Sequence, residues 1–233
     1  QLEEPIEVTL NAQDEELGVR MAMALGLRMD CPYVCLHVRE TGFYGSKEGV
    51  GKTTRNASIE NFIPAIQYLA ENNYQIVRIG DPTMTPLPDI NGLIDYPFSS
   101  EKSHLMDIWL IKNCEFYIGH NSGPMDVAYL FHKPILIPNI AEFIMGNPAR
   151  AGDLCLLKHV FSKKEKRYLS VEELVELYLM NDTKPFSNPD YQFIENTPDE
   201  ILHLVSEYLA VNSQANGKRK VSDLQKTVLE RRW

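Results

Sequence analysis

The 233-residue chain contains 44% hydrophobic and 24% charged residues, a composition typical of a globular protein with a buried core. Its formal net charge of -9 argues against nucleic-acid binding, because surfaces of that kind usually carry a basic stripe. No apolar run is long enough for a bilayer, so we expect no transmembrane segment and at most a peripheral membrane association. The four cysteines form no CxxC pair, which favours free thiols and a reducing, cytoplasmic location.

The ends of the chain differ from its centre. Residues 6–10 alternate like a short strand and residues 14–27 have helical spacing. We therefore expect residues 1–30 to form a linker strand and helix that remain from an N-terminal domain. The chain begins without Met and without a signal sequence, which favours a fragment of a longer protein. Residues 31–211 are expected to form the main domain, and residues 212–233 a polar tail.

Compact apolar runs alternate with helical periodicity through the centre of the chain. The runs predict strands that are buried on both faces, as in a parallel sheet, at residues 33–38, 75–81, 93–95, 116–118 and 134–137. Helices are expected between them, at residues 61–72, 104–114 and 124–131. The predicted fold class is therefore α/β, a Rossmann-like doubly wound parallel sheet.

The pattern is weaker after Pro138. Residues 139–168 hold few periodic signals, apart from a charge run that begins at Lys163. Two C-terminal helices follow, each opened by a capping box, at Ser170 and at Thr197.

Residues 116–126 predict a strand, a tight turn and a helix in direct succession. Such a turn leaves backbone N–H groups unpaired at the positive end of the helix, where phosphate or carboxylate binds readily. The expected phosphate-binding residues are His120, Asn121, Ser122 and Gly123, of which His120 is the weaker candidate.

Charged side chains stand at the ends of two predicted strands. His37 and Arg39 are two residues apart, so they share one face of the first strand. Arg39 can grip a phosphate through two parallel N–H bonds, and the alternative is an ion pair with Glu40 or Asp81. His37 is either a hydrogen-bonded core histidine or a group that takes part in binding or proton transfer. Asp81 orients Arg39, binds a ribose hydroxyl or starts a turn.

The segment from Lys47 to Thr54 looks like the phosphate loop of a nucleotide triphosphatase. However, Ser46 stands where the pattern requires Gly, and Glu48 would oppose a bound phosphate. Polar residues also separate the segment from the strand before it and the helix after it. A surface loop is therefore the favoured interpretation, and a deviant ATPase is the alternative.

The sequence does not select a general base. Residues that qualify by type are Glu40, Asp81, Asp95, Asp107, Asp126 and Glu142. No His, Cys and Asp cluster has metal-ligand spacing, so we expect no tightly bound metal or cofactor.

Several of these segments together resemble a bacterial family of glycosyltransferases. Its members look like the nucleotide-sugar-binding C-terminal half of GT-B enzymes, with an H-x-R element similar to that of fucosyltransferases. The resemblance covers roughly residues 15 to 210, and the segments that carry it are 37–42, 55–58, 78–82, 118–123, 133–134 and 162–169. The sequence departs from the family at His120-Asn121, where relatives tend to have smaller hydroxylated residues, and at 47–54.

The resemblance implies a site for a nucleotide-diphosphate sugar. In it Arg39 meets the diphosphate, Ser122 and Gly123 close over it, and Lys163 and Lys164 are available to acidic groups at its border. It also implies that a missing N-terminal domain binds the acceptor. The expected function is transfer of a sugar to a glycan or lipid-linked acceptor, as in polysaccharide biosynthesis, with Arg39 and His37 as catalytic residues. A non-catalytic nucleotide-binding module is the second alternative.

Overall fold

The buried apolar runs form the centre of a six-stranded sheet in the computed structural model, which describes residues 8–41, 54–141, 150, 152–180 and 188–213. The strands are β1 (Tyr33–His37), β2 (Gln75–Arg78), β3 (Leu93–Asp95), β4 (Tyr117–Gly119), β5 (Ile135–Ile140) and β6 (Leu154–Leu157). All pairings are parallel, in the order β3-β2-β1-β4-β5-β6. The predicted doubly wound α/β fold is confirmed, and its strand order reverses between β1 and β4.

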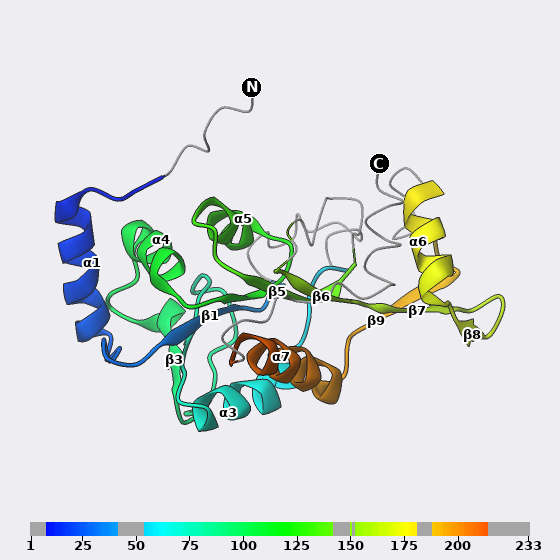
Figure 1. Ribbon diagram of the computed structural model, residues 1–233. Coiled ribbons are helices and arrows are strands. Elements are labelled where there is room, and N and C mark those ends of the chain that lie inside the picture. Colours follow the sequence, from blue (N-terminus) through cyan, green and yellow to red (C-terminus); the bar gives the residue numbers. More distant parts are fainter. Residues whose placement is uncertain (1–7, 42–53, 142–149, 151, 181–187, 214–233) are drawn as a thin grey trace.

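Helices cover both faces of this sheet (Figure 1). One face carries α1 (Ala12–Ala24), α4 (His104–Asn113) and α5 (Gly123–Leu130). The other face carries α3 (Ile63–Glu71) and α7 (Pro198–Ser213). Two short 3-10 helices, η2 (Ile59–Phe62) and η3 (Tyr96–Phe98), precede α3 and α4. Among the described helices, none is long and apolar enough to cross a membrane.

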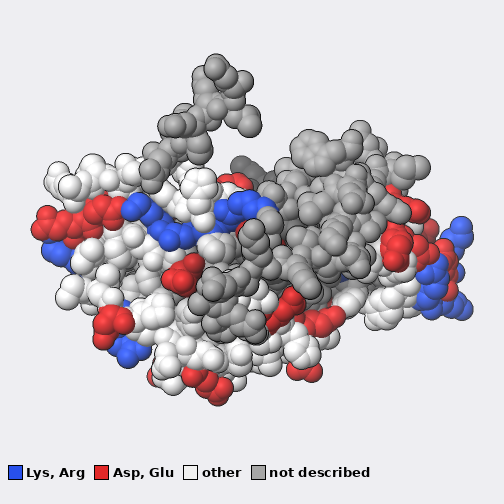
Figure 2. Space-filling view, in the orientation of Figure 1, with Lys and Arg blue, Asp and Glu red and all other residues white. Residues whose placement is uncertain are grey.

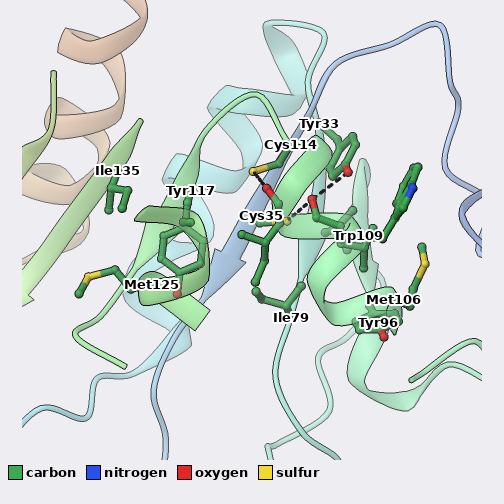
Figure 3. Close-up of a cluster of buried hydrophobic side chains, with 14 of the residues drawn as sticks. Tyr33, Cys35, Ile79, Tyr96, Met106, Trp109, Cys114, Tyr117, Met125 and Ile135 are labelled. Carbon is green, nitrogen blue, oxygen red and sulfur yellow. Dashed lines mark hydrogen bonds between the residues drawn. The ribbon is translucent and has the colours of Figure 1, made fainter. Parts of the chain in front are cut away.

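The strands read as unbroken apolar runs because both of their faces are buried. In β1, Tyr33 and Cys35 point into the cluster under α1, α4 and α5, which Figure 3 shows around Trp109. Val34 and Leu36 point into the cluster under α3 and α7. Alternate side chains of one strand thus enter two separate cores, as expected for a parallel sheet covered on both sides.

Helix α1 packs directly on α4. A Cβ added to Gly18 would lie 2.1 Å from the Trp109 ring, so only glycine allows this close approach. The indole Nε1 of Trp109 donates to Glu15 at 3.0 Å. Ala22 of α1 belongs to the same buried cluster as β1, so this helix is part of the main core and not a linker. The strand expected from residue 6 is absent from residues 8–11.

A second, smaller sheet follows β6. It consists of β7 (His159–Ser162), β8 (Arg167–Tyr168) and β9 (Tyr191–Ile194), paired antiparallel in the order β8-β7-β9. Helix α6 (Val171–Met180) lies beside it, away from the main sheet (Figure 1). These strands were not predicted. The expectation that β5 ends before Pro138 is also wrong, because β5 continues to Ile140 through an irregular register.

Candidate functional site

A cavity of about 790 Å³ opens at the carboxyl ends of β1 and β2, beside the first turns of α4 and α5. Its position is the point where the strand order reverses, which is where open α/β sheets bind ligands. The predicted site residues that line it are His37, Arg39, Asp81, Asn121, Ser122 and Gly123. The expectation that Arg39 and the Ser122 turn share one cleft is confirmed, while their roles stay predictions.

The turn between β4 and α5 requires a close approach to β1. A Cβ added to Gly119 would lie 2.8 Å from the carbonyl oxygen of His37 and 2.6 Å from the Tyr117 hydroxyl. Glycine at this position therefore lets the ends of β1 and β4 meet. Ser122 is then the N-cap of α5, with extended backbone angles, and the helix points its positive end at the cavity.

Ser122 and His37 contact each other across these two strand ends. The Ser122 hydroxyl donates to the carbonyl oxygen of His120 at 3.1 Å and lies 3.2 Å from Nδ1 of His37. Because a hydroxyl has one hydrogen, His37 Nδ1 must donate to Ser122, which leaves the lone pair on Nε2. Burial lowers the pKa of His37 to about 4, and Asp81 opposes that shift. His37 is therefore a neutral imidazole at physiological pH.

Arg39 is held from several sides at the wall of the cavity. Its backbone N–H donates to Nδ1 of His120 at 3.0 Å, and its carbonyl accepts from the N–H of Ala57 at 3.0 Å. Its guanidinium donates to the side-chain oxygen of Asn56. Only 8% of Arg39 is exposed, so these contacts fix the direction of its charge.

His120 has a different place from the one predicted. It is 1% exposed, does not line the cavity and packs edge-on against Phe62 on the α3 side of the sheet. Burial keeps its pKa well below the usual value, so the ring is neutral and accepts the Arg39 N–H. His120 therefore supports the backbone of Arg39 instead of binding phosphate.

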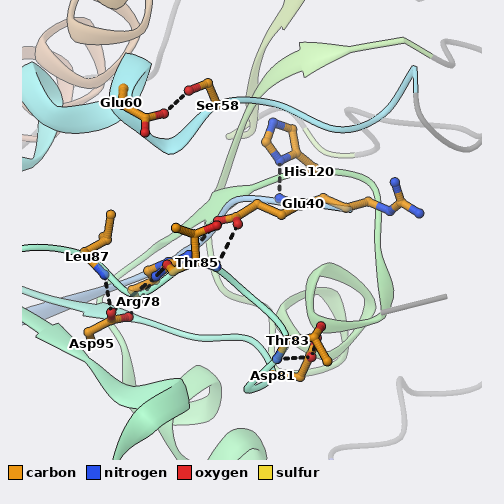
Figure 4. A network of polar contacts seen from close by, with 11 residues as sticks. Glu40, Ser58, Glu60, Arg78, Asp81, Thr83, Thr85, Leu87, Asp95 and His120 are labelled. Atoms are coloured by element: carbon orange, nitrogen blue, oxygen red, sulfur yellow. Dashed lines mark hydrogen bonds and ion pairs between the residues drawn. The ribbon is translucent and has the colours of Figure 1, made fainter. Parts of the chain in front are cut away.

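A second arginine, Arg78, pairs with Glu40, which was one of the two alternative ion-pair partners of Arg39. Its side chain is fully buried and pairs with Glu40 at 2.6 Å and Asp95 at 3.0 Å (Figure 4). It also donates to the carbonyl oxygen of Thr85 at 2.8 Å. The ends of β1, β2 and β3 and the loop after β2 are thereby joined in one network, and Glu40 pairs with Arg78.

Asp81 starts the turn after β2, which was one of its three predicted roles. Its Oδ1 accepts the backbone N–H of Thr83 at 2.9 Å, which forms the expected turn after β2. It also lines the cavity and acts electrostatically on His37. Whether it meets a ribose hydroxyl stays a prediction.

Two cations of the cavity wall were not predicted as site residues. Arg55 lines the cavity and its Nη1 lies 3.5 Å from the carbonyl oxygen of Asn121. Lys102 lines it beside α4 and pairs with Asp107. Arg55 belongs to a polar stretch without strand or helix periodicity, so only the resemblance carried by residues 55–58 drew attention to it. With Arg39, the cavity lining therefore contains three cationic side chains, beside the carboxylates of Glu40, Asp81, Asp107 and Asp126.

Lys163 and Lys164 are not brought to this cavity. They lie in the turn between β7 and β8, and the Lys163 ammonium donates to the carbonyl oxygen of Pro189 at 2.8 Å. The reason is that β7 pairs with β9 in the smaller sheet, which leads the chain away from the main one. Figure 2 shows basic and acidic side chains mixed at that end of the molecule, and Arg167 there pairs with Glu173.

Two further expectations concern residues at the limits of the description. The ATPase-like segment lies outside the described residues except for its last member, Thr54. Within the described ranges, no group of three or more His, Cys, Asp or Glu side chains could hold a metal ion.

Comparison with known proteins supports the fold. No family model and no curated protein matches the chain. The glycosyl transferase family 9 structure from Veillonella parvula DSM 2008 is similar, with a TM-score of 0.54 and 12% identity, over 88% of this chain and 54% of that one. ADP-heptose LPS heptosyltransferase II of E. coli is similar with a TM-score of 0.50 and 12% identity, over 91% and 56%. The fold is glycosyltransferase-like, and the chain spans about half the length of both structures.

Proposed function

We propose that this chain is the nucleotide-sugar-binding half of a glycosyltransferase that moves a sugar from a nucleotide-diphosphate donor to a glycan or lipid-linked acceptor. The observation that carries the proposal is the single cavity that joins Arg39, Arg55 and the positive end of α5. These groups suit a ligand with two adjacent negative charges, because arginine and a helix N-terminus are both phosphate-binding elements.

The same groups favour the transfer step. When the bond between sugar and diphosphate breaks, negative charge grows on the departing phosphate oxygens. Arg39 and the N–H group of Gly123, which follows the N-cap Ser122, are fixed before the reaction by the contacts described above, so they stabilise this charge without reorganisation. This assigns transition-state stabilisation to the described half of the site.

His37 has a separate role in the proposal. It lines the cavity as a neutral imidazole whose Nδ1 donates to Ser122, so Nε2 is able to accept a proton or a hydrogen bond. We assign to His37 Nε2 the role of accepting from a hydroxyl group of the donor or acceptor that lies next to the diphosphate.

The acceptor side of the reaction is assigned to a second domain, since the chain spans about half of the similar structures. That domain would supply the acceptor site and the general base, and the reaction would take place in the cytoplasm. Transfer would proceed without a tightly held metal, which EDTA treatment of the full-length enzyme tests directly.

Calorimetry with GDP, UDP, ADP and their sugars tests the proposal. We expect one of the diphosphates to bind with a micromolar to low millimolar Kd, and Arg39→Ala to weaken that binding. Absence of binding by all of them at millimolar concentration would overturn the proposal. Binding without turnover by the full-length protein would favour the non-catalytic module. The ATPase alternative requires that Lys52→Ala abolish magnesium-dependent ATP hydrolysis while Arg39→Ala leaves nucleotide binding intact.

A further inference from the structure

The segment that carries Asn56 and Ala57 has no helix or strand of its own, yet it supplies two contacts to Arg39. Asn56 accepts from the guanidinium, and the Ala57 N–H donates to the Arg39 carbonyl. The position of Arg39 in the cavity therefore depends on what holds this segment.

Two charged residues that flank strands of the smaller sheet hold this segment. The ammonium group of Lys158, between β6 and β7, donates to the carbonyl oxygen of Asn56 at 2.7 Å. The carboxylate of Glu195, directly after β9, accepts from the N–H of Ser58 at 2.9 Å and from the side-chain amide of Asn61 at 3.0 Å. The segment is thus gripped at the two places where the smaller sheet joins the main one.

Lys158 is the more informative of the two because its burial is costly. It is 3% exposed, and burial lowers the pKa of its ammonium group, an effect that Glu195 opposes. A buried lysine usually destabilises a protein unless its hydrogen bonds compensate for lost hydration. Here the side chain donates to the carbonyl of the residue that holds the Arg39 guanidinium. Lys158 does not line the cavity, so it acts on a ligand only through other residues.

We propose that Lys158 is a positioning residue that fixes Arg39 for diphosphate binding through Asn56. The inference rests on the proposed function, which makes Arg39 the diphosphate ligand. The chain of contacts runs from the Lys158 ammonium to the Asn56 backbone, and from the Asn56 side chain to the Arg39 guanidinium. Through these contacts the junction between the two sheets influences the donor site, although no strand of the smaller sheet lines the cavity.

The first test needs no nucleotide. Phenylglyoxal modifies accessible arginines, and mass spectrometry follows the rate at Arg39 in Lys158→Met and Lys158→Arg. We expect Lys158→Met to raise this rate about fivefold, the factor for one lost hydrogen bond, and Lys158→Arg to stay near wild type. Exposed Arg20 and fully buried Arg78 are internal references whose rates should not change.

An unchanged rate at Arg39 in Lys158→Met would overturn the proposal. A parallel rise at Arg78 would do the same, because it would show general loosening. Lys112→Met serves as a matched control variant, since it removes a partly buried ion pair between α4 and α1. If Lys158→Met does not fold, Asn56→Ala breaks the next link of the chain and is expected to raise the rate at Arg39 similarly.

The second test separates positioning from plain stability. In calorimetry, Lys158→Met should weaken binding of the diphosphate about fivefold and leave binding of the matching nucleoside unchanged. Adding Asn56→Ala should cause little further loss, because both changes break one chain of contacts. Equal losses for nucleoside and diphosphate would contradict the proposal. Failure of the wild type to bind any diphosphate would instead strike the proposed function, while the modification rates still decide the link from Lys158 to Arg39.

Discussion

Two buried arginines near the carboxyl ends of neighbouring strands, Arg39 and Arg78, differ in the partners of their guanidinium groups. Arg78, at the end of β2, is fully buried and meets two carboxylates, so its charge joins three strand ends. Arg39, just after β1, lies at the cavity wall, and its guanidinium donates to the neutral amide of Asn56. The same side-chain type thus joins strand ends at one position and lines the cavity at the other.

The largest expected effect comes from removing the bracing arginine. Arg78→Met leaves Glu40 and Asp95 partly buried without their partner, which should lower the free energy of unfolding by about 3–5 kcal/mol. Urea denaturation followed by circular dichroism measures it. The control is Arg20→Met, which removes an exposed pair with Glu16 and should cost less than about 0.5 kcal/mol. Equal losses in both variants would contradict the structural role of Arg78.

Removing the cavity arginine should change binding more than folding. Arg39→Ala is expected to weaken diphosphate binding about 30- to 150-fold, because charge-assisted hydrogen bonds contribute roughly 2–3 kcal/mol. Arg39→Lys should recover only part of this loss, since lysine lacks the planar fork. Calorimetry with the best-binding diphosphate measures both. If Arg39→Ala binds like wild type, the cavity wall has been assigned to the wrong ligand.

The neutral histidine of the cavity predicts a pH dependence of stability. The folded-state pKa of His37 is about 4 against a usual value of 6.5, so the unfolded chain binds more protons between these values. Stability therefore rises with pH through this window, is complete above about pH 6.5 and falls as the pH drops toward 4. Across this pH window we expect His37 to change the free energy of unfolding by about 1–2 kcal/mol, after allowance for its partial exposure. Denaturation of wild type and His37→Gln at pH 5 and 7 should show a shallower slope in the variant.

The smallest effect is expected at the basic turn between β7 and β8. Lys163→Ala and Lys164→Ala should change diphosphate affinity by less than about twofold, because long-range attraction between exposed charges is screened by salt. Calorimetry at physiological ionic strength checks this. A tenfold loss of diphosphate affinity in either variant would contradict this prediction. It would mean that the lysine takes part in binding and that the smaller sheet moves toward the cavity.

The sequence predicted those parts of the site that depend on strand and helix periodicity. The runs of β1 and β4 place His37, Arg39 and Ser122 at strand ends, and parallel strands bring such ends together. Arg55 was missed because it stands in a segment without periodicity, positioned by tertiary contacts. His120 was misplaced because strand alternation alone does not show that its ring enters the core beside Phe62.

The smaller sheet was missed for a related reason. The burial of β7 alternates but its sequence does not, because polar Ser162 is buried and apolar Phe161 is half-buried, and both residues of β8 are exposed. The smaller sheet therefore gives neither the continuous apolar run of a central strand nor a clear alternation of apolar and polar residues. The continuation of β5 past Pro138 depends on Asn139, which has a positive φ of 58°. Asn139 also exchanges backbone-to-side-chain hydrogen bonds of 2.6 Å with Asn196. A contact between residues this far apart leaves no local signal.

The last described helix has a consequence for how the chain folds during synthesis. α7 covers the same face of the main sheet as α3, and its Tyr208 packs on Phe116 beside β4, with ring centroids 4.6 Å apart. The ribosome makes α1, α4 and α5 early enough to close the opposite face while elongation continues. The part of the α3 face that α7 covers stays exposed to solvent until residues 198–213 leave the exit tunnel. A nascent chain that ends at residue 180 should therefore bind chaperones or aggregate, whereas one that extends past residue 213 should resist proteolysis.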